Sequence, residues 1–438
     1  MKKNVIIAGA AGRDFHNFLS YYKKHDFYNV VAFTATQIPG ISGRKFPAKL
    51  SGKKYPRGIP IFDEAKLPGL VKKFNVQEVA LSYSDLSHEY VMHFASMVQA
   101  TGADFILLGP YSTQLVSKKP VISVCAVRTG SGKSQTSRKI AQLLLRAGKK
   151  VAVVRHPMPY GDLGKEAVQR FAEFSDFEKH KVTIEEREEY ESYVERGIVV
   201  FAGVDYEKIL RMAEKEADVV IWDGGNNDFS FFKSDLRFVV ADPLRAGHEV
   251  SYYPGETNFR MADVIVINKV NSAKKTDVQK IVANAKKFNP KALVLLADSV
   301  LRVSEPAKIK GRRVLVVEDG PTLTHGGMPF GAGFVAAKKF GAKEIVDAKK
   351  SAVGSIREVY KKFPHLGRVL PAMGYSKKQM HELEQTINNS SAEVIVSGTP
   401  IDLGRDLKVG KEIVSVKYEL AEKGKTTLES ILKKHGFI

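Results

Sequence analysis

The sequence has 438 residues, 44% of them hydrophobic and 26% charged, which excludes an intrinsically disordered chain and predicts two or three folded domains. Lys and Arg outnumber Asp and Glu by 68 to 48, so the formal net charge is +20. We therefore expect an anionic partner: a nucleotide, a phosphorylated metabolite, nucleic acid or a membrane surface. The single cysteine, Cys125, excludes an intramolecular disulfide and a cysteine metal cluster within one chain.

The apolar segments are all shorter than the roughly 18 residues that a membrane span needs, so the sequence predicts no membrane helix. The apolar run at the N-terminus gives way to charged sequence after about eight residues, which favours a first β-strand over a signal peptide. We expect a cytoplasmic protein. The many Lys and Glu residues and the single tryptophan also suit a thermophile.

Residues 1–118 alternate between strand and helix patterns, which predicts a Rossmann-like parallel sheet that binds an anion or a substrate. Strands are expected over residues 4–12, 29–36, 76–84 and 103–110. Helices are expected over residues 15–25, 64–74 and 88–102. A polar loop rich in Pro, Gly and Lys is expected over residues 37–60.

A second α/β unit, a P-loop NTPase domain of kinase or ligase type, is expected over residues 119–400, after a linker at 117–120. The segment 165–196 interrupts its alternation and is predicted to be an inserted pair of helices. Residues 401–438 are expected to add a strand and a closing helix. The whole chain is therefore predicted to be α/β.

The strongest functional motif lies between the apolar strand 121–127 and a helix. It consists of Thr129, Gly130, Ser131, Gly132, Lys133 and Ser134. Glycines allow backbone N–H groups to surround phosphates, the lysine reaches the β- and γ-phosphates, and the serine hydroxyl holds Mg²⁺. Val127 replaces the first glycine of the strict pattern. We predict a nucleotide-binding loop that extends to Gln135, with Lys133 as a catalytic residue.

Two further strand ends carry residues typical of a nucleotide site. Asp223 ends an apolar strand and is predicted to hold Mg²⁺ together with Ser134, and to take part in catalysis. Asn268 and Lys269 follow another apolar strand, where guanine-binding proteins carry an Asn-Lys-x-Asp motif. Asn271 replaces the aspartate and offers one acceptor oxygen in place of two, so selectivity for guanine should weaken. ATP is therefore expected, with GTP as the alternative.

Four runs of the chain, 222–229, 239–256, 262–269 and 317–333, resemble a family of P-loop proteins labelled "predicted GTPase" or cyclic 2,3-diphosphoglycerate synthetase-like. The resemblance covers essentially the whole chain, and the core is also similar to tetraacyldisaccharide kinases and dethiobiotin synthetase. It implies ATP, Mg²⁺ and a phosphorylated glycerate, of which one end is phosphorylated before an internal phosphate closes a ring. The family usually has Asp at the position of Asn271.

The acceptor site is expected beyond the carboxyl ends of the strands. Arg155 is predicted to neutralise a transferring phosphoryl group. The other predicted substrate-binding residues are His156, Asp162, Asn226, Asn227, Arg245, His248 and His325. Asp228 and Glu249 lie in the same loops. For each lone histidine or aspartate, a structural hydrogen bond is the alternative role.

The N-terminal turn carries a second glycine motif, with Gly9, Gly12 and Arg13. Ile7 occupies the first glycine position of a dinucleotide-binding motif, and no acidic residue ends the following strand, so NAD binding is weakly supported. A phosphorylated or CoA-like anion, or a purely structural turn, is the alternative.

Three functions remain open from the sequence. The first is ATP-dependent phosphoryl transfer to a small phosphorylated or carboxylated acid, and the second is a regulatory GTPase. The third, nucleic-acid binding, is disfavoured because basic residues are spread along the chain without interleaved aromatic residues. We expect a homodimer.

Overall fold

The computed structural model describes residues 2–10, 12–36, 41–156, 161, 163–225, 228–324, 327–373 and 377–438. The chain forms two compact units. Unit 1 comprises residues 1–170, 198–296 and 422–438, and unit 2 comprises residues 171–197 and 297–421. The predicted N-terminal region 1–118 falls within unit 1, whereas the range 119–400 contributes to both units.

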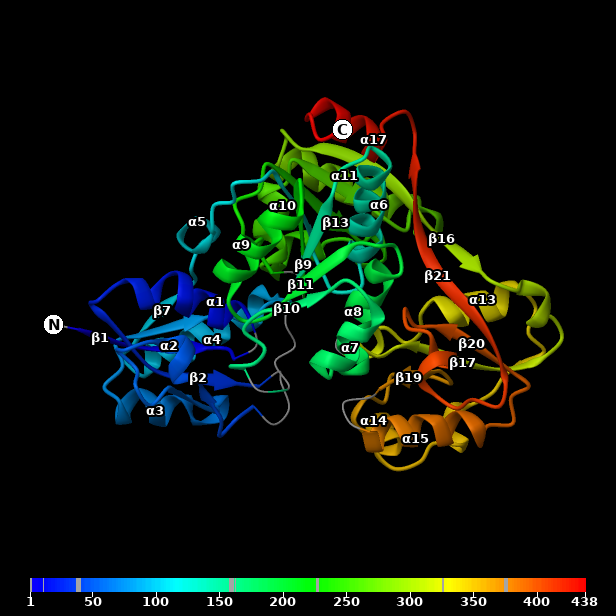
Figure 1. Ribbon diagram of the computed structural model, residues 1–438, viewed down its shortest axis with the longest axis horizontal. Coiled ribbons are helices and arrows are strands. Elements are labelled where there is room, and N and C mark those ends of the chain that lie inside the picture. The colour runs from blue at the N-terminus through cyan, green and yellow to red at the C-terminus, as the bar shows by residue number, and fades with distance from the viewer. Residues whose placement is uncertain are drawn as a thin grey trace. The chain divides into compact units, whose positions relative to one another are not determined.

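The first sheet of unit 1 has six strands in the order β3-β4-β2-β1-β5-β7 (Figure 1). The pairings are parallel, apart from the antiparallel β3 and β4. The strands are β1 (Lys3–Ala8), β2 (Tyr28–Ala35), β3 (Lys45–Phe46), β4 (Ile59–Asp63), β5 (Glu78–Leu81) and β7 (Asp104–Ile106). The helices are α1 (Arg13–Ser20), α2 (Ala48–Ser51), α3 (Leu67–Lys73), α4 (His88–Ala100) and α5 (Pro110–Thr113).

The prediction of a loop over residues 37–60 is wrong for its second part. This part contains β3, α2 and the start of β4. Phe46, Ile59 and Ile61 are buried, so their side chains tie the segment to the edge of the sheet. The many Pro, Gly and Lys residues of this segment favour the prediction of a loop, because they interrupt the short alternation of buried and accessible positions.

The second sheet of unit 1 carries the P-loop. Its order is β10-β11-β9-β12-β8-β13-β15-β16, and the pairings from β11 to β16 are parallel. The strands are β8 (Val121–Ala126), β9 (Val151–Arg155), β10 (Gln169–Phe171), β11 (Val199–Ala202), β12 (Val219–Gly224), β13 (Leu236–Ala241), β15 (Val264–Ile267) and β16 (Leu293–Val303). The helices are α6 (Lys133–Arg146), α9 (Tyr206–Glu216), α10 (Gly255–Met261), α11 (Lys275–Phe288) and α17 (Leu428–Lys434). The predicted parallel α/β class is confirmed.

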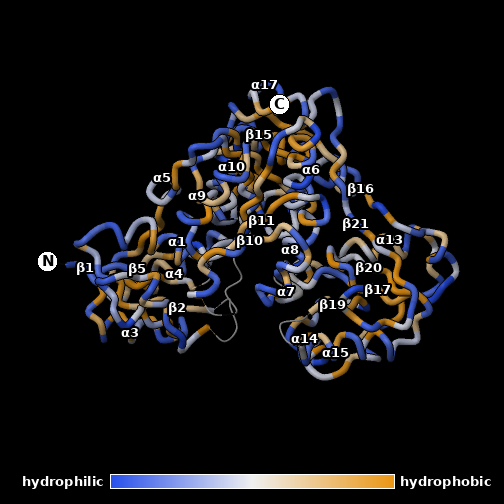
Figure 2. Tube along the Cα trace, in the orientation of Figure 1, coloured by the Kyte–Doolittle hydropathy of each residue, from blue (hydrophilic) through white to orange (hydrophobic). Residues whose placement is uncertain are grey.

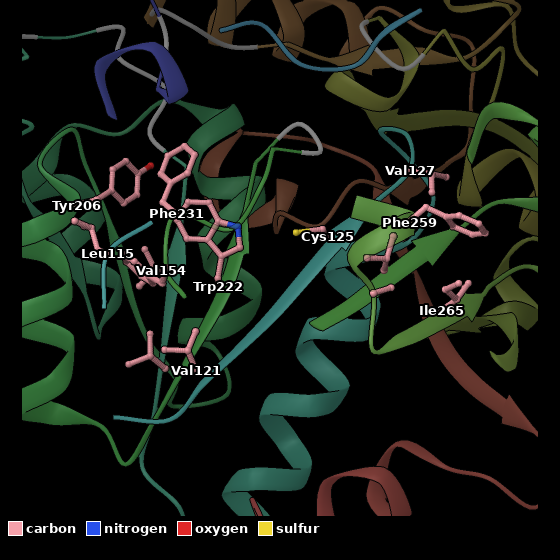
Figure 3. Close-up of a cluster of buried hydrophobic side chains, with 14 of the residues drawn as sticks. Leu115, Val121, Cys125, Val127, Val154, Tyr206, Trp222, Phe231, Phe259 and Ile265 are labelled. Atoms are coloured by element: carbon pink, nitrogen blue, oxygen red, sulfur yellow. The ribbon is translucent and has the colours of Figure 1, made fainter. Parts of the chain in front are cut away.

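A cluster of buried aromatic side chains fixes the strand that carries Asp223. The ring of Trp222 lies 4.5 Å from that of Phe231, and Tyr206 packs edge-on at 4.7 Å from the same phenylalanine (Figure 3). Such pairs stabilise a core by about 0.5–1.5 kcal/mol each beyond the burial of their area. Figure 2 shows hydrophobic stretches of the chain along strands such as β17 and β20. The position of Asp223, next to Trp222, is therefore set by packing.

Unit 2 contains a smaller set of strands in which β16 continues and is followed by β21, β20, β17 and β18, with β19 also paired to β17. The pairings of β17 with β18, β19 and β20, and of β20 with β21, are parallel. Its own strands are β17 (Arg313–Asp319), β18 (Glu344–Ile345), β19 (Leu370–Ala372), β20 (Val394–Gly398) and β21 (Glu412–Lys423). Its helices are α7 (Phe174–His180), α8 (Ile184–Val194), α12 (Gly320–Leu323), α13 (Ala332–Lys339), α14 (Ser355–Lys362), α15 (Lys377–Asn388) and α16 (Leu403–Asp406). Helices α7 and α8 fall in the segment predicted as an insertion. Within the described ranges, none of the helices has the length and apolarity that a bilayer span requires.

Candidate functional site

The P-loop connects β8 to α6 and depends on two glycines with positive φ. Gly130 has φ of +79° and Gly132 has φ of +105°, conformations that side-chain-bearing residues rarely adopt. A Cβ atom on Gly132 would also lie 2.0 Å from Nδ2 of Asn268. Gly132, the residue before α6, has no side chain to cap the first turn of this helix, which starts at Lys133. The N-terminal end of this helix is therefore suited to bind phosphate.

Side chains from the neighbouring strand ends bind three successive carbonyl groups of the loop. Arg245 Nη2 donates to the carbonyl oxygen of Thr129 at 2.7 Å. Lys269 Nζ donates to that of Gly130 at 2.7 Å, and Asn268 Nδ2 donates to that of Ser131 at 3.0 Å. These three side chains, which we call the brace, hold the carbonyl groups of the loop in place. Asn268 and Lys269 thus contact the loop itself.

Asp242, at the end of β13, organises two of these cations. Its Oδ2 accepts from Lys269 at 2.8 Å and from Arg245 at 3.0 Å. Burial alone would raise the pKa of Asp242, but the charges of Lys269 and Arg245 lower it. Burial lowers the pKa of Lys269 despite this partner. The buried Asp242 thus pairs with both cations of the brace, which are themselves half-buried.

The predicted catalytic residues Lys133, Asp223 and Arg155 lie in direct contact. Lys133 Nζ donates to Oδ1 of Asp223 at 2.9 Å and also to its carbonyl oxygen. Ser137, one helical turn after Lys133, donates to the same Oδ1 at 2.6 Å, and Arg155 Nη1 donates to Oδ2. Asp223 is fully buried. Burial and the nearby Arg155 charge lower the pKa of Lys133 to about 8.

Ser134 and Asp223 were predicted to hold Mg²⁺. Ser134 is half-buried in the first turn of α6, and a serine hydroxyl with a carboxylate is the oxygen donor set that Mg²⁺ uses beside phosphates. The described residues contain no group of three or more His, Cys, Asp or Glu side chains suited to a metal. The pair of a serine hydroxyl and a carboxylate fits an ion whose further ligands are phosphate oxygens of a nucleotide.

Arg128, inside the P-loop, connects this loop to the first sheet. Its Nε donates to Oδ1 of Asp85 at 2.5 Å, and its guanidinium stacks at 3.8 Å over the ring of Tyr252. Nδ1 of His248 lies 2.8 Å from Nη1 of Arg128, and the His248 ring stacks on the ring of Tyr252 at 4.5 Å between centroids. Burial, then the Arg128 charge, lowers the pKa of His248. The predicted substrate residue His248 is thus a neighbour of the P-loop.

The N-terminal turn meets the strand end that carries His156. Gly12 is so close to the His156 ring that a Cβ atom would lie 1.9 Å from Cε1. Arg13 is buried and lies 4.0 Å from Asp228, whose other oxygen lies 3.0 Å from His156 Nε2. The glycine at position 9 instead faces Asp14, with a Cβ position 2.6 Å from its Oδ2.

Four predicted site residues, Asp162, Asn226, Asn227 and His325, lie outside the described residues. The glycine-rich segment that follows His325 is described from Gly327 onward, and several of its N–H groups have partners. Those of Gly331, Gly333 and Phe334 donate to the buried carboxylate of Glu318 at 3.1, 3.2 and 2.8 Å. They are therefore engaged within unit 2. Burial raises the pKa of Glu318 to about 7.

Several residues at these sites were not singled out from the sequence. They are Asp85, Arg128, Ser137, Asp242 and Tyr253. Ser137 was within reach of pattern reasoning, because it lies four residues after Lys133 on one helix face. Asp242 ends an apolar strand as Asp223 does. The contacts of the other residues depend on how the two sheets of unit 1 pack.

Comparison with known proteins identifies one close relative. The chain is 61% identical over 432 residues to arginine synthetase ArcE of Thermococcus kodakarensis, covering 99% of this chain and 96% of the relative. A search against family models finds no match. Among solved structures, LpxK of Aquifex aeolicus in complex with ATP is 15% identical, with a TM-score of 0.45 over 84% of this chain and 99% of LpxK. A plasmid partition protein of Borrelia burgdorferi bound to AMPPNP is 14% identical, with a TM-score of 0.26 over 41% of this chain and 86% of its own. On the strength of the first match, the chain belongs to the family of arginine synthetase ArcE.

Proposed function

We propose that this protein is an ATP-dependent synthetase that forms arginine. The observation that carries the proposal is the P-loop cluster of Lys133, Asp223 and Arg155, in a chain that is 61% identical to an arginine synthetase. A P-loop with a lysine, an arginine and a buried carboxylate is suited to γ-phosphoryl transfer. A synthetase needs such a transfer to drive bond formation.

The chemistry of arginine suggests the acceptor. Citrulline differs from arginine by one ureido oxygen in place of one nitrogen. Transfer of the γ-phosphoryl group of ATP to that oxygen makes a leaving group, and attack of ammonia on the ureido carbon then expels inorganic phosphate. The sum converts ATP, citrulline and an ammonium ion to ADP, phosphate and arginine in its guanidinium form, with one proton released because the ammonium ion must lose a proton before it attacks. The acceptor is carboxylated, as expected from the sequence.

Each residue of the cluster has a role in this scheme. Lys133 leaves Asp223 and binds the β- and γ-phosphates, and Arg155 neutralises charge on the group in transfer. Ser134 and Asp223 hold Mg²⁺, which neutralises phosphate charge when bound. Burial of Asp223 and Arg155 keeps water from weakening these interactions.

The test is an assay of the purified full-length chain with ATP, Mg²⁺, citrulline and an ammonium salt. We expect arginine and ADP in equal amounts, and no arginine when any component is omitted. Lys133→Met should abolish the reaction. Asn388→Ala, at an exposed position of unit 2, is the control that should retain it. Release of ADP without arginine, or no release of ADP at all, would refute the proposal.

Two narrower predictions remain for the same assay. Replacing citrulline with 2,3-diphosphoglycerate tests ring formation as implied by the family resemblance. Replacing ATP with GTP tests the GTPase alternative, for which Asn271 is unfavourable. The predicted homodimer and cytoplasmic location stay predictions.

A further inference from the structure

A buried pair of opposite charges joins the two sheets of unit 1. Arg13, the first residue of α1, is 3% exposed, and Asp228, which follows β12, is 4% exposed. Arg13 Nη2 donates to the Tyr253 hydroxyl at 2.7 Å and to the carbonyl oxygen of Leu108 at 3.3 Å. Asp228 Oδ2 lies 3.0 Å from His156 Nε2. Arg13 is thus held by hydrogen bonds through Nη2, and Asp228 lies within ion-pair distance of His156 through Oδ2.

The other polar ends of this pair face each other without a hydrogen bond. Arg13 Nη1 and Asp228 Oδ1 lie 4.0 Å apart, and neither atom has a hydrogen-bond partner among the residues that the structure describes. Buried polar groups in folded proteins nearly always have a partner, and a charged group left without one is especially unfavourable. A donor and an acceptor are therefore available together inside the protein.

The surroundings hold both side chains in place. The Arg13 guanidinium lies over the ring of Phe229 at 4.3 Å and near that of Tyr253 at 5.2 Å. Gly12 and Gly225 close on the ring of His156, where a Cβ atom would lie 1.9 and 2.4 Å from the histidine. Larger residues at these glycines would displace His156. The stacking and the close approach of the two glycines thus fix the positions of Arg13 and His156.

The pair matches one class of ligand. A carboxylate accepts from a guanidinium, and an ammonium group donates to a carboxylate, with charge assistance in both cases. An α-amino acid carries both groups on one carbon. A phosphate would meet the repulsive charge of Asp228. The neighbouring His16 adds no positive charge near neutrality, since burial lowers its pKa to about 3.

We propose that Arg13 and Asp228 bind the α-carboxylate and α-amino groups of the amino-acid substrate, with His156 positioning Asp228. This inference rests on the proposed function and specifies how its substrate is recognised. The chain order supports it, because His156 directly follows Arg155 and Asp228 lies five residues after Asp223. The two strand ends that carry the predicted reacting groups thus also carry the head-group site.

The experiment measures binding of three ligands to the full-length protein by calorimetry. L-arginine has both head groups, agmatine lacks the carboxylate, and 5-guanidinopentanoate lacks the amino group. We expect arginine to bind about 10- to 100-fold more tightly than either analogue, as for the loss of one charged hydrogen bond. Arg13→Met should lower the affinity for arginine to that for agmatine and leave agmatine unchanged. Asp228→Asn should lower the affinity for arginine to that for 5-guanidinopentanoate and leave the affinity for 5-guanidinopentanoate unchanged.

The controls separate recognition from folding. Arg302→Met removes an exposed arginine of unit 2, paired with Glu419, and should change no affinity. If Arg13→Met loses ATP binding as well, Arg13→Lys replaces it, and should retain part of the preference for arginine over agmatine. A variant that weakens all three ligands equally would refute the head-group site. Equal binding of arginine and both analogues to the wild type would also refute it. Failure of the wild type to bind arginine at all would instead refute the proposed function on which the site rests.

Discussion

The brace beneath the P-loop makes Asn268 a sharp test of how the nucleotide site is built. Asn268 is fully buried, and its Nδ2 donates one hydrogen bond of 3.0 Å to the carbonyl of Ser131. Asn268→Ala removes this donor and leaves the carbonyl unsatisfied, which costs about 1–3 kcal/mol. ATP binding requires the ordered loop, so the dissociation constant for ATP should rise about 5- to 150-fold, at 1.36 kcal/mol per factor of ten.

Asn268→Asp should weaken ATP binding further than Asn268→Ala does. It replaces a donor with a carboxylate that faces the Ser131 carbonyl and adds negative charge beside the phosphate site. Calorimetric titration with ATP gives the constants, and thermal unfolding checks that the variants fold. The matched control is Asn388→Ala, which removes an Asn-to-carbonyl bond of 2.9 Å in unit 2 and should not affect ATP. Wild-type affinity in Asn268→Ala would show that the brace does not shape the loop.

Three more predictions concern charge. The pKa of Lys133 is lowered to about 8 in the free protein, whereas bound phosphates favour its protonated form, so ATP affinity should fall by up to about tenfold per pH unit above pH 8. Titrations across pH 7–10 measure this slope. A slope that persists in Lys133→Arg would assign it to another group. Arg155→Lys should lower kcat by about 10³-fold, because the guanidinium neutralises charge in the transition state. Steady-state kinetics measure this effect. An unchanged kcat would show that Arg155 has no catalytic role. The pKa of Glu318 is raised to about 7 in the folded state, against an ordinary value of 4.5. The folded state therefore binds the proton more tightly than the unfolded state does. The free energy of unfolding should decrease as pH rises from 4.5 to 7, by up to about 1.4 kcal/mol per pH unit. Denaturant unfolding at several pH values checks this, and Glu318→Gln should flatten the dependence; the same slope in that variant would contradict the assignment.

The sequence predicts the parts of the site that depend on local spacing. Gly132 and Lys133 lie at a strand-to-helix junction, and Asp223 ends an apolar strand, so their positions follow from pattern alone. The motif at Asn268 was recognised, but its contact with the Ser131 carbonyl arises because β13 pairs with β8 on one side and with β15 on the other. No local pattern encodes that order.

The pair of Arg13 and Asp228 shows more strongly what sequence patterns cannot predict. The two residues are 215 positions apart by their numbers; Arg13 starts the helix that follows β1 of the first sheet, and Asp228 lies in the loop after β12 of the second. Each is unremarkable in sequence, since a lone arginine after a glycine turn and a lone aspartate in a loop most often have structural roles. Their meaning depends on burial and on atoms left without partners, which only the packed structure reveals.

The discontinuous make-up of unit 1 has a consequence for its biosynthesis. Helix α6, which starts the nucleotide site, packs against α17, and Lys139 of α6 pairs with Glu422, a residue 283 positions later. At about 5–20 residues per second, a ribosome needs roughly 15–60 s to synthesise that interval. Helix α6 is therefore synthesised before all of unit 2 and cannot contact α17 until unit 2 has been translated. The first sheet is complete much earlier and can fold ahead of the nucleotide site during translation.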